Sequence, residues 1–170
     1  MTTAALLVID IQEDYFPGGV LPLHEALKVE ERLVAAIRRA QAAGERVVLV
    51  QHVSPAQSGL FAAGSRGAEI RQAILSAAPA APVVRKQFAD AFQDTDLSRH
   101  LDGVTQLRIC GMMTQNCVVF TAMTALASGY DVTVIGDLCT APMEVVHRIA
   151  LNALRSKMTV RDAEEVWPAA

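Results

Sequence analysis

The chain has 170 residues, with 15 Lys and Arg against 18 Asp and Glu, so its formal net charge is −3. Hydrophobic residues make up 52% of the sequence and charged residues 19%, which argues against a disordered chain and suits one domain with a large apolar core. The near balance of charge argues against a dedicated nucleic-acid-binding protein. We therefore expect a single domain spanning residues 1–170.

The sequence predicts neither a secretory signal peptide nor a membrane anchor. No basic segment precedes the first apolar run, which ends at Asp10, and the apolar stretch at residues 117–127 is shorter than the ~18–20 residues of a membrane helix. The cysteines Cys110, Cys117 and Cys139 are odd in number and lack CxxC spacing, which favours a reducing compartment over a disulfide framework. We therefore expect a cytoplasmic protein.

Strands and helices alternate along the chain. Short apolar runs rich in β-branched residues predict strands at Ala4–Ile9, Arg46–Gln51, Pro82–Arg85, Gln106–Cys110, Asp131–Gly136 and Met158–Val160. Helical spacing predicts helices near residues 27–43, 68–78, 94–101, 115–128 and 142–156. In the first helix, Leu27, Leu33 and Ile37 fall on the apolar face and Glu30 on the polar face. This order predicts an α/β fold, a three-layer α/β/α sandwich with a mostly parallel sheet of about six strands.

Two long loops rich in Gly and Pro follow the first and second predicted strands, at residues 13–24 and 53–67. Ligands of open parallel sheets bind at the carboxyl ends of the strands, so we expect these loops to form walls of a pocket. Four residues in or near the loops around this edge form the predicted substrate-binding set: Gln12, Phe16, Phe61 and Phe92. The aromatic side chains indicate a small, partly apolar substrate.

Three side chains that could take part in catalysis follow three different predicted strands. Asp10 follows the first strand, Lys86 the third, and Cys117 comes a few residues after the fourth. Each alone has an ordinary structural explanation, but a parallel sheet brings such strand ends to one edge. Cys117 lies in or near the first turn of a helix, where free N–H groups and the helix dipole lower the pKa of a thiol. We therefore expect a thiolate, with Asp10 as proton acceptor and Lys86 holding both charges.

Three stretches carry a resemblance to a known family: LLVIDIQEDYFPGG, VVRKQFADAFQDTDL and GMMTQNCVVFTAMTALASGYDVTVIGDLC. In order and spacing they resemble the isochorismatase-like cysteine hydrolases, which include nicotinamidases and N-carbamoylsarcosine amidohydrolase. The resemblance extends over about residues 6–154. It implies a catalytic triad in which Cys117 is the nucleophile, Asp10 is the general base and acid, and Lys86 tunes both.

The resemblance also implies backbone features and bears on metal binding. It implies a cis peptide bond between Met112 and Met113, and an oxyanion hole formed by the backbone N–H groups of Met113 and Cys117. Nicotinamidases of the family hold a metal with an Asp-x-His pair and a further His, whereas the corresponding residues 50–55 contain only His52. One imidazole does not hold Zn²⁺. We therefore expect no metal and no cofactor, and expect His52 to hydrogen-bond or pack near the pocket.

The presence of Cys117 favours hydrolysis of a C–N bond in a small amide or carbamoyl compound through a thioester. Three alternatives remain open. An isochorismatase-type vinyl-ether hydrolase would need cations for a dicarboxylate, and only Arg66 and Arg71 are candidates. A thiol redox enzyme would need a resolving cysteine, and Cys110 and Cys139 are expected to be buried structural thiols. A non-catalytic scaffold of the same fold is the third alternative.

The predicted partners are a small-molecule substrate and further copies of the chain, with no nucleic acid and no membrane. The helix that follows Cys117 is apolar nearly all round, so a second subunit is expected to cover the side that the sheet does not. We therefore expect a homo-oligomer, either a dimer or a tetramer. On the last long helix, Glu144 and His147 lie three residues apart and are expected to pair on the surface.

Overall fold

The computed structural model describes residues 3–168, within which six strands form one sheet. The strands are β1 (Ala4–Ile9), β2 (Arg46–His52), β3 (Val83–Lys86), β4 (Gln106–Met112), β5 (Asp131–Thr140) and β6 (Thr159–Arg161). Their order is β3-β2-β1-β4-β5-β6, and each neighbouring pair is parallel. The predicted parallel α/β architecture is confirmed, although β4 and β5 continue further than their apolar runs indicated.

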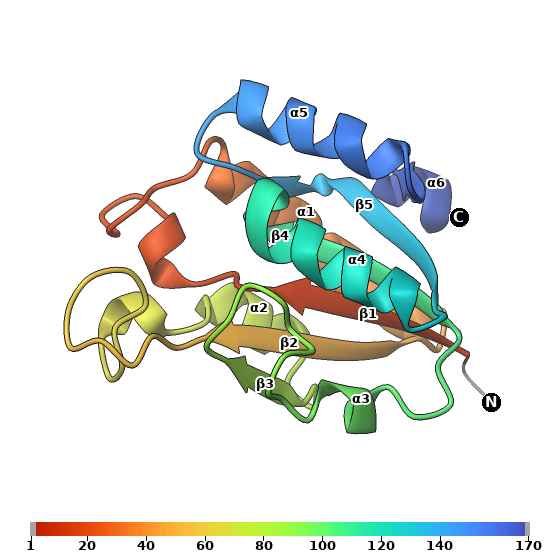
Figure 1. The fold of residues 1–170 in the computed structure, drawn as a ribbon, viewed down its shortest axis with the longest axis horizontal. Coiled ribbons are helices and arrows are strands. Elements are labelled where there is room, and N and C mark those ends of the chain that lie inside the picture. The colour runs from red at the N-terminus through yellow and green to blue at the C-terminus, as the bar shows by residue number, and fades with distance from the viewer. Residues whose placement is uncertain (1–2, 169–170) are drawn as a thin grey trace.

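Helices cover both faces of the sheet, which makes the predicted three layers. The helices α1 (Ala26–Ala42) and α2 (Gln72–Ala77) lie on one face, and α4 (Val119–Ala127) and α5 (Glu144–Arg155) lie on the other (Figure 1). Shorter helical segments are η1 (Glu13–Tyr15), η2 (Arg66–Ala68), α3 (Leu97–His100), η3 (Thr114–Val118) and α6 (Ala163–Val166). None of the helices in this part of the chain has the length and apolar character that crossing a bilayer requires.

The buried face of α1 is rotated from the predicted one. Its stripe begins at Ala26 and continues through Val29 and Leu33, so Leu27 points to solvent and Glu30 is buried. Glu30 is stabilised there by Arg71, whose Nε donates to Glu30 Oε1 at 2.7 Å. The prediction for Leu27 and Glu30 was therefore wrong, because an ion pair to a residue 41 positions away decides which side of the helix can be buried.

The strand order has its switch point between β1 and β4. After β1 the chain passes through α1 to β2, whereas after β4 it passes through α4 on the opposite face to β5 (Figure 1). The loops therefore diverge at the carboxyl ends of these two central strands, and such a switch point is where ligands of doubly wound sheets bind. Asp10 follows β1, and η3, which contains Cys117, follows β4.

The two central strands approach each other closely at this edge because β4 has a glycine there. Gly111 has φ +124°, and a Cβ at this position would lie 2.1 Å from the carbonyl oxygen of Ile9. Any other residue would clash with the β1 backbone. Gly111 thus lets β4 continue beside β1 to the point where the turn into η3 begins.

Candidate active site

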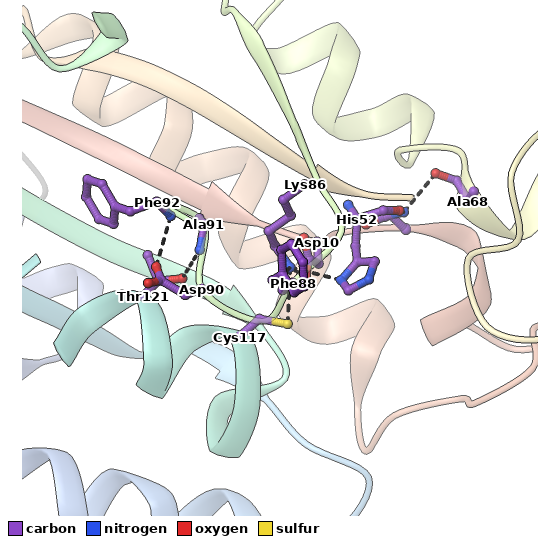
Figure 2. A network of polar contacts seen from close by, with 11 residues as sticks. Asp10, His52, Ala68, Lys86, Phe88, Asp90, Ala91, Phe92, Cys117 and Thr121 are labelled. Carbon is purple, nitrogen blue, oxygen red and sulfur yellow. Dashed lines mark hydrogen bonds and ion pairs between the residues drawn. The ribbon is translucent and has the colours of Figure 1, made fainter. Parts of the chain in front are cut away.

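Four strand ends bring four functional side chains together. Asp10 directly follows β1 and has φ +55°, a left-handed conformation that Asp tolerates better than most residues. His52 and Lys86 are the last residues of β2 and β3 and are register partners in the sheet. Cys117 lies in η3, after β4. The predicted convergence of Asp10, Lys86 and Cys117 is observed, and His52 joins them (Figure 2).

The ammonium group of Lys86 lies at the centre of the site. Its Nζ is 2.8 Å from Asp10 Oδ2, 3.0 Å from His52 Nδ1, 3.0 Å from the Phe88 carbonyl oxygen and 3.3 Å from Cys117 Sγ. The side chains of Lys86 and Asp10 are completely buried. An ammonium has three hydrogens and no acceptor, so the contacts with His52, Phe88 and Cys117 account for all three, and Asp10 is held by its charge.

Lys86 keeps its charge although it is buried. Burial is the largest single effect and lowers the pKa of Lys86, but the neighbouring Asp10 and Cys117 together raise the pKa above its ordinary value. The contact with Asp10 is an ion pair without hydrogen-bond alignment, and the two Asp10 carboxylate oxygens accept no hydrogen bond from the residues that the structure describes. Asp10 therefore has lone pairs available for a proton.

The surroundings of Cys117 favour the protonated thiol over the thiolate that the sequence predicted. Burial raises the pKa of Cys117 most, the Asp10 carboxylate raises it further, and Lys86 lowers it by less. The sequence prediction counted the free N–H groups of the helical turn and not the loss of water around the sulfur. A proton acceptor is therefore needed before the sulfur can attack, and Asp10 is next to it.

Gln12 has a structural role in this arrangement instead of the predicted place in the substrate pocket. Its side-chain amide nitrogen donates to the carbonyl oxygens of His52 and Ala68, each at 2.8 Å. Its Oε1 accepts from the His52 backbone N–H, also at 2.8 Å. Gln12 is fully buried, and both its N–H donors are used. It joins the end of β1 to the end of β2 and thereby fixes the backbone that carries His52.

Phe16 and Phe61 were predicted to line the substrate pocket, and both are 1% exposed. Phe16 packs under the guanidinium of Arg71 at 4.3 Å, so the prediction for this residue was wrong. Phe61 packs edge-on against Tyr15, with ring centroids 4.7 Å apart, and touches the His52 ring at 5.6 Å. Phe61 therefore supports the site through His52. Phe61 and Phe16 hold their loops to the core because each ring finds a partner from a distant segment.

Arg71 is not free to bind an anionic substrate. Its guanidinium donates to Glu13 Oε2 at 2.9 Å and to both carboxylate oxygens of Glu30, at 2.7 Å and 3.1 Å. These carboxylates raise the pKa of Arg71 against the opposing effect of burial. Arg66, the other candidate cation, is exposed in η2. Arg71 is therefore not available as a cation for binding a dicarboxylate.

The segment after β3 contains two phenylalanines with different positions. The Phe92 ring lies against Tyr130, with centroids 6.0 Å apart, and points away from Cys117 (Figure 2). Its prediction as a substrate-binding residue was therefore wrong. Phe88 instead contacts the Lys86 ammonium through its carbonyl oxygen (Figure 2), and its side chain is 43% exposed. The sequence signal for it was its position two residues after Lys86, since residues i and i+2 of an extended chain share a side.

A depression of about 500 Å³ opens next to Phe88. Its lining residues are Val53, Arg85, Lys86, Gln87, Phe88 and Asp94. It reaches Lys86, whose ammonium contacts the sulfur of Cys117, and Cys117 itself is only 2% exposed. The site is therefore closed around the sulfur, and the depression lies beyond Lys86.

The segment containing Phe88 is attached to the helix that follows Cys117. The Ala91 N–H donates to Thr121 Oγ1 at 2.9 Å (Figure 2), and the Thr124 hydroxyl donates to Asp90 Oδ2 at 2.7 Å. Both threonines belong to α4. These bonds fix the residues just beyond Phe88 while its side chain stays at the surface.

Asp14 joins the two long loops. Its carboxylate accepts from the Val20 N–H at 3.2 Å and from the Phe61 N–H at 2.7 Å. A Cβ at Gly67 would lie 2.1 Å from Asp14 Oδ1, so glycine is needed for this close approach. The loops at residues 13–24 and 53–67 are therefore packed against each other by a buried carboxylate on one side of the site.

The implied cis peptide bond between Met112 and Met113 is present. The Met113 carbonyl then accepts from the backbone N–H groups of Asn116 at 3.1 Å and Val118 at 3.3 Å, which closes the turn around Cys117. The use of the Met113 and Cys117 N–H groups as an oxyanion hole stays a prediction.

His147 supports the same turn and does not form the predicted pair with Glu144. Its Nδ1 lies 2.7 Å from Thr114 Oγ1, and Thr114 is buried in η3. Cys110 and Cys139 are buried free thiols, as expected, and burial raises the pKa of each. Neither is exposed to a reactant.

The site contains three residue types that could bind a metal. Asp10, His52 and Cys117 each offer a ligand atom within 4.8 Å of the others. All three side chains, however, contact the ammonium of Lys86. A divalent cation there would meet a fixed positive charge at short range, so the donor set does not fit a metal while Lys86 is protonated.

Comparison with known proteins gives a consistent family relationship. The family model described as the Isochorismatase domain matches residues 4–165. The chain is 32% identical over 165 residues to the isochorismatase family protein YddQ of Bacillus subtilis (strain 168), covering 89% of this chain and 91% of YddQ. The crystal structure of an isochorismatase-type hydrolase from Oleispira antarctica matches with a TM-score of 0.92 and 31% identity, covering 99% of this chain and 97% of that chain.

Among the relatives named for a substrate is a streptothricin hydrolase. The chain is 38% identical over 135 residues to a streptothricin hydrolase of Streptomyces noursei, which covers 78% of this chain and 48% of that protein. The chain therefore spans about half the length of this relative.

Proposed function

Since the chain belongs to the isochorismatase family, we propose that it is a metal-independent cysteine hydrolase that cleaves the C–N bond of a small amide or carbamoyl compound. The observation that carries the proposal is the buried contact of Lys86 with both Asp10, at 2.8 Å, and Cys117, at 3.3 Å. It unites a nucleophile, a proton acceptor and a fixed positive charge. The similarity to a streptothricin hydrolase supports hydrolysis as the class of reaction.

Formation of the covalent intermediate begins with the protonated thiol. Asp10 accepts the Cys117 proton as the sulfur attacks the carbonyl carbon, so a C–S bond forms and the carbonyl π electrons move to oxygen. The Met113 and Cys117 backbone N–H groups then stabilise the oxyanion. Lys86 holds the negative charge on the sulfur while the proton is on Asp10.

Breakdown of this tetrahedral species releases the amine. The C–N bond breaks, the leaving nitrogen takes the proton from Asp10, and a thioester remains on Cys117. Water then gives a proton to Asp10 and adds to the thioester. The C–S bond breaks, the carboxylic acid product leaves, the proton on Asp10 returns to the sulfur, and the resting enzyme is restored. Atoms balance as amide plus water giving acid plus amine.

Access to the sulfur requires movement. Cys117 is 2% exposed, whereas the neighbouring Phe88 is 43% exposed and lines the adjacent depression. A substrate arriving through this depression meets Phe88 first, so the Phe88 side chain has to turn away before an amide carbonyl reaches Sγ. Closure afterwards would exclude bulk water from the oxyanion.

The test is to trap the acyl enzyme. The wild-type protein, Cys117→Ser and Cys110→Ala are incubated with a library of small amides and analysed by intact-protein and peptide mass spectrometry. We expect an acyl adduct on Cys117 in the wild-type protein and in Cys110→Ala, and a loss of turnover of at least about a thousandfold in Cys117→Ser.

Other outcomes would exclude the proposal. A Cys117→Ser variant as active as the wild-type protein would exclude cysteine as the nucleophile. Oxidation of Cys117 by peroxide without acylation by any amide would favour a redox enzyme. A protein in which Cys117 reacts with neither would be a non-catalytic member of the fold.

A further inference from the structure

His52 is held at the reacting sulfur by contacts that fix both its backbone and its ring. Gln12 hydrogen-bonds to the N–H and the carbonyl oxygen of His52, each at 2.8 Å. The imidazole packs against Phe61 at 5.6 Å. A ligand atom of His52 lies within 4.8 Å of Cys117 Sγ. The mechanism proposed above uses none of these features.

The contact with Lys86 determines which ring nitrogen carries the proton. Lys86 Nζ is 3.0 Å from His52 Nδ1, and an ammonium can only donate. Nδ1 is therefore the unprotonated, accepting nitrogen. Burial and the Lys86 charge lower the pKa of His52, which keeps the ring neutral at pH 7. A neutral imidazole that accepts at Nδ1 has its single hydrogen on Nε2.

The Nε2–H group has no acceptor in the protein. Within residues 3–168, the only hydrogen bond of the His52 side chain is the one at Nδ1. Unlike the Asp10 carboxylate oxygens, Nε2 is not sealed from solvent, so water or a ligand can reach it. The ring thus keeps one unpaired donor, Nε2–H, on the side of the imidazole away from its contact with Lys86.

We propose that His52 is a substrate-binding residue whose Nε2–H donates a hydrogen bond to an acceptor atom adjacent to the acyl group that Cys117 attacks. The inference deepens the proposed function and rests on it. It restricts the substrate to amides that have a second oxygen or nitrogen acceptor near the scissile carbonyl. A substrate without that acceptor would leave a polar N–H desolvated and unpaired in the complex.

The charges around the site favour a neutral acceptor over a carboxylate. The Lys86 ammonium is already paired with Asp10, and Arg71 is paired with Glu13 and Glu30. Arg85 lines the adjacent depression but donates to Gln51 Oε1 at 3.2 Å, so a substrate carboxylate beside His52 itself would be desolvated next to a Lys86 charge that Asp10 already balances. The substrate class is therefore a small amide with an uncharged acceptor.

The tautomer is tested first, because it does not depend on turnover. In protein labelled with ¹⁵N-histidine, we expect the His52 signals near pH 7.5 to show a protonated Nε2 and an unprotonated Nδ1, with the signal assigned through His52→Asn. Addition of 2-methoxyacetamide to the Cys117→Ser variant should shift the Nε2 resonance. Butanamide, in which a methylene replaces the ether oxygen, should shift it far less. A protonated Nδ1, or an Nε2 signal that methoxyacetamide does not move, overturns the proposal.

Selectivity is tested next with a matched pair of variants. His52→Asn keeps an acceptor for Lys86 but has no atom at the Nε2 position, whereas His52→Gln can place an amide N–H there. We expect the wild-type kcat/KM to favour methoxyacetamide over butanamide by about tenfold, the size of one hydrogen bond. The ratio should fall to about one in His52→Asn and recover in part in His52→Gln. Malonamate, which has a carboxylate, should be the poorest substrate.

The outcomes separate this inference from the proposed function. A wild-type preference that persists in His52→Asn overturns the role of His52 and leaves the cysteine hydrolase intact. If no amide acylates Cys117, the proposed function fails, and the ¹⁵N measurements on bound methoxyacetamide still decide the role of His52. Alkylation of Cys117 by iodoacetamide should change less than about twofold in His52→Asn, because the variant retains the Lys86 partner. A larger change would show that His52 acts through Lys86 instead of through the substrate.

Discussion

The ammonium of Lys86 balances the charge of the Asp10 carboxylate, which contacts no other cation within residues 3–168. Asp10 is fully buried, and its oxygens receive no aligned hydrogen bond within residues 3–168. Lys86→Met should therefore lower the free energy of unfolding by about 3–5 kcal/mol, because the Asp10 charge stays buried without its partner. The double variant Asp10→Asn with Lys86→Met should recover most of this loss. Urea denaturation measures both.

A surface lysine provides the control for this prediction. Lys28 pairs with Glu25, but its side chain is 65% exposed, so Lys28→Met should change stability by less than about 1 kcal/mol. Equal effects at both lysines, or no recovery in the double variant, would contradict an ion pair that the fold requires.

The Cys117 thiol should be less reactive at neutral pH than an ordinary cysteine. Burial and Asp10 raise the pKa of the thiol, so a smaller fraction is thiolate at any given pH. The alkylation rate with iodoacetamide in the folded protein should therefore still rise above pH 9, whereas the thiols of the urea-unfolded protein should level off around their usual pKa of about 8.5. A plateau near neutral pH in the folded protein would show a resting thiolate. Peptide mass spectrometry assigns the alkylated cysteine.

At the scale of single elements, we expect the segment between β3 and α3 to control access to the sulfur. Phe88 follows Lys86 by two residues and its side chain is 43% exposed, whereas Phe92 packs on Tyr130 and points away from Cys117 (Figure 2). Phe88→Ala should speed alkylation of Cys117 severalfold, because it removes the side chain at the entrance. Phe92→Ala is the matched control and should leave the rate nearly unchanged. Equal acceleration by both would indicate general loosening of the segment.

The two long loops form one element because Asp14 binds backbone N–H groups in both. Asp14→Ala removes the bonds to Val20 and Phe61 and should cost about 2–4 kcal/mol of stability, since both involve a charged acceptor. Hydrogen exchange should show faster exchange at the Val20 and Phe61 amides. The exposed neighbour Glu69 provides the control, and Glu69→Ala should leave both amides protected. Unchanged exchange in Asp14→Ala would show that the rings alone hold the loops.

At the scale of the whole molecule, one face has more apolar surface than one chain covers. Phe120, Met123 and Leu126 follow one side of α4 and are 53%, 40% and 37% exposed. On α5, which covers the same face of the sheet (Figure 1), Val145 and Ile149 are also exposed. A second subunit on this face stays a prediction. Light scattering at micromolar concentration should give a dimer or tetramer, and Phe120→Glu should shift it toward monomer. A monomeric wild-type protein would contradict the prediction.

The sequence by itself determined the architecture and the three reactive residues. Continuous apolar runs such as Ala4–Ile9 form strands buried on both faces, and the helices between them require parallel crossovers. A parallel sheet places all its carboxyl ends at one edge, so Asp10, Lys86 and Cys117 had to meet once their strands were recognised. These conclusions depend on local periodicity and on the topology that it implies, both of which are present in the order of residues.

Only the tertiary structure decided how those residues and their neighbours behave. Burial raises the pKa of the Cys117 thiol, and Gln12 supports His52, 40 positions away, instead of binding substrate. The role of Lys86 depends likewise on Cys117, 31 positions further along the chain. Desolvation and hydrogen-bond partnership depend on distances between segments that are remote in sequence, and no local pattern contains those distances.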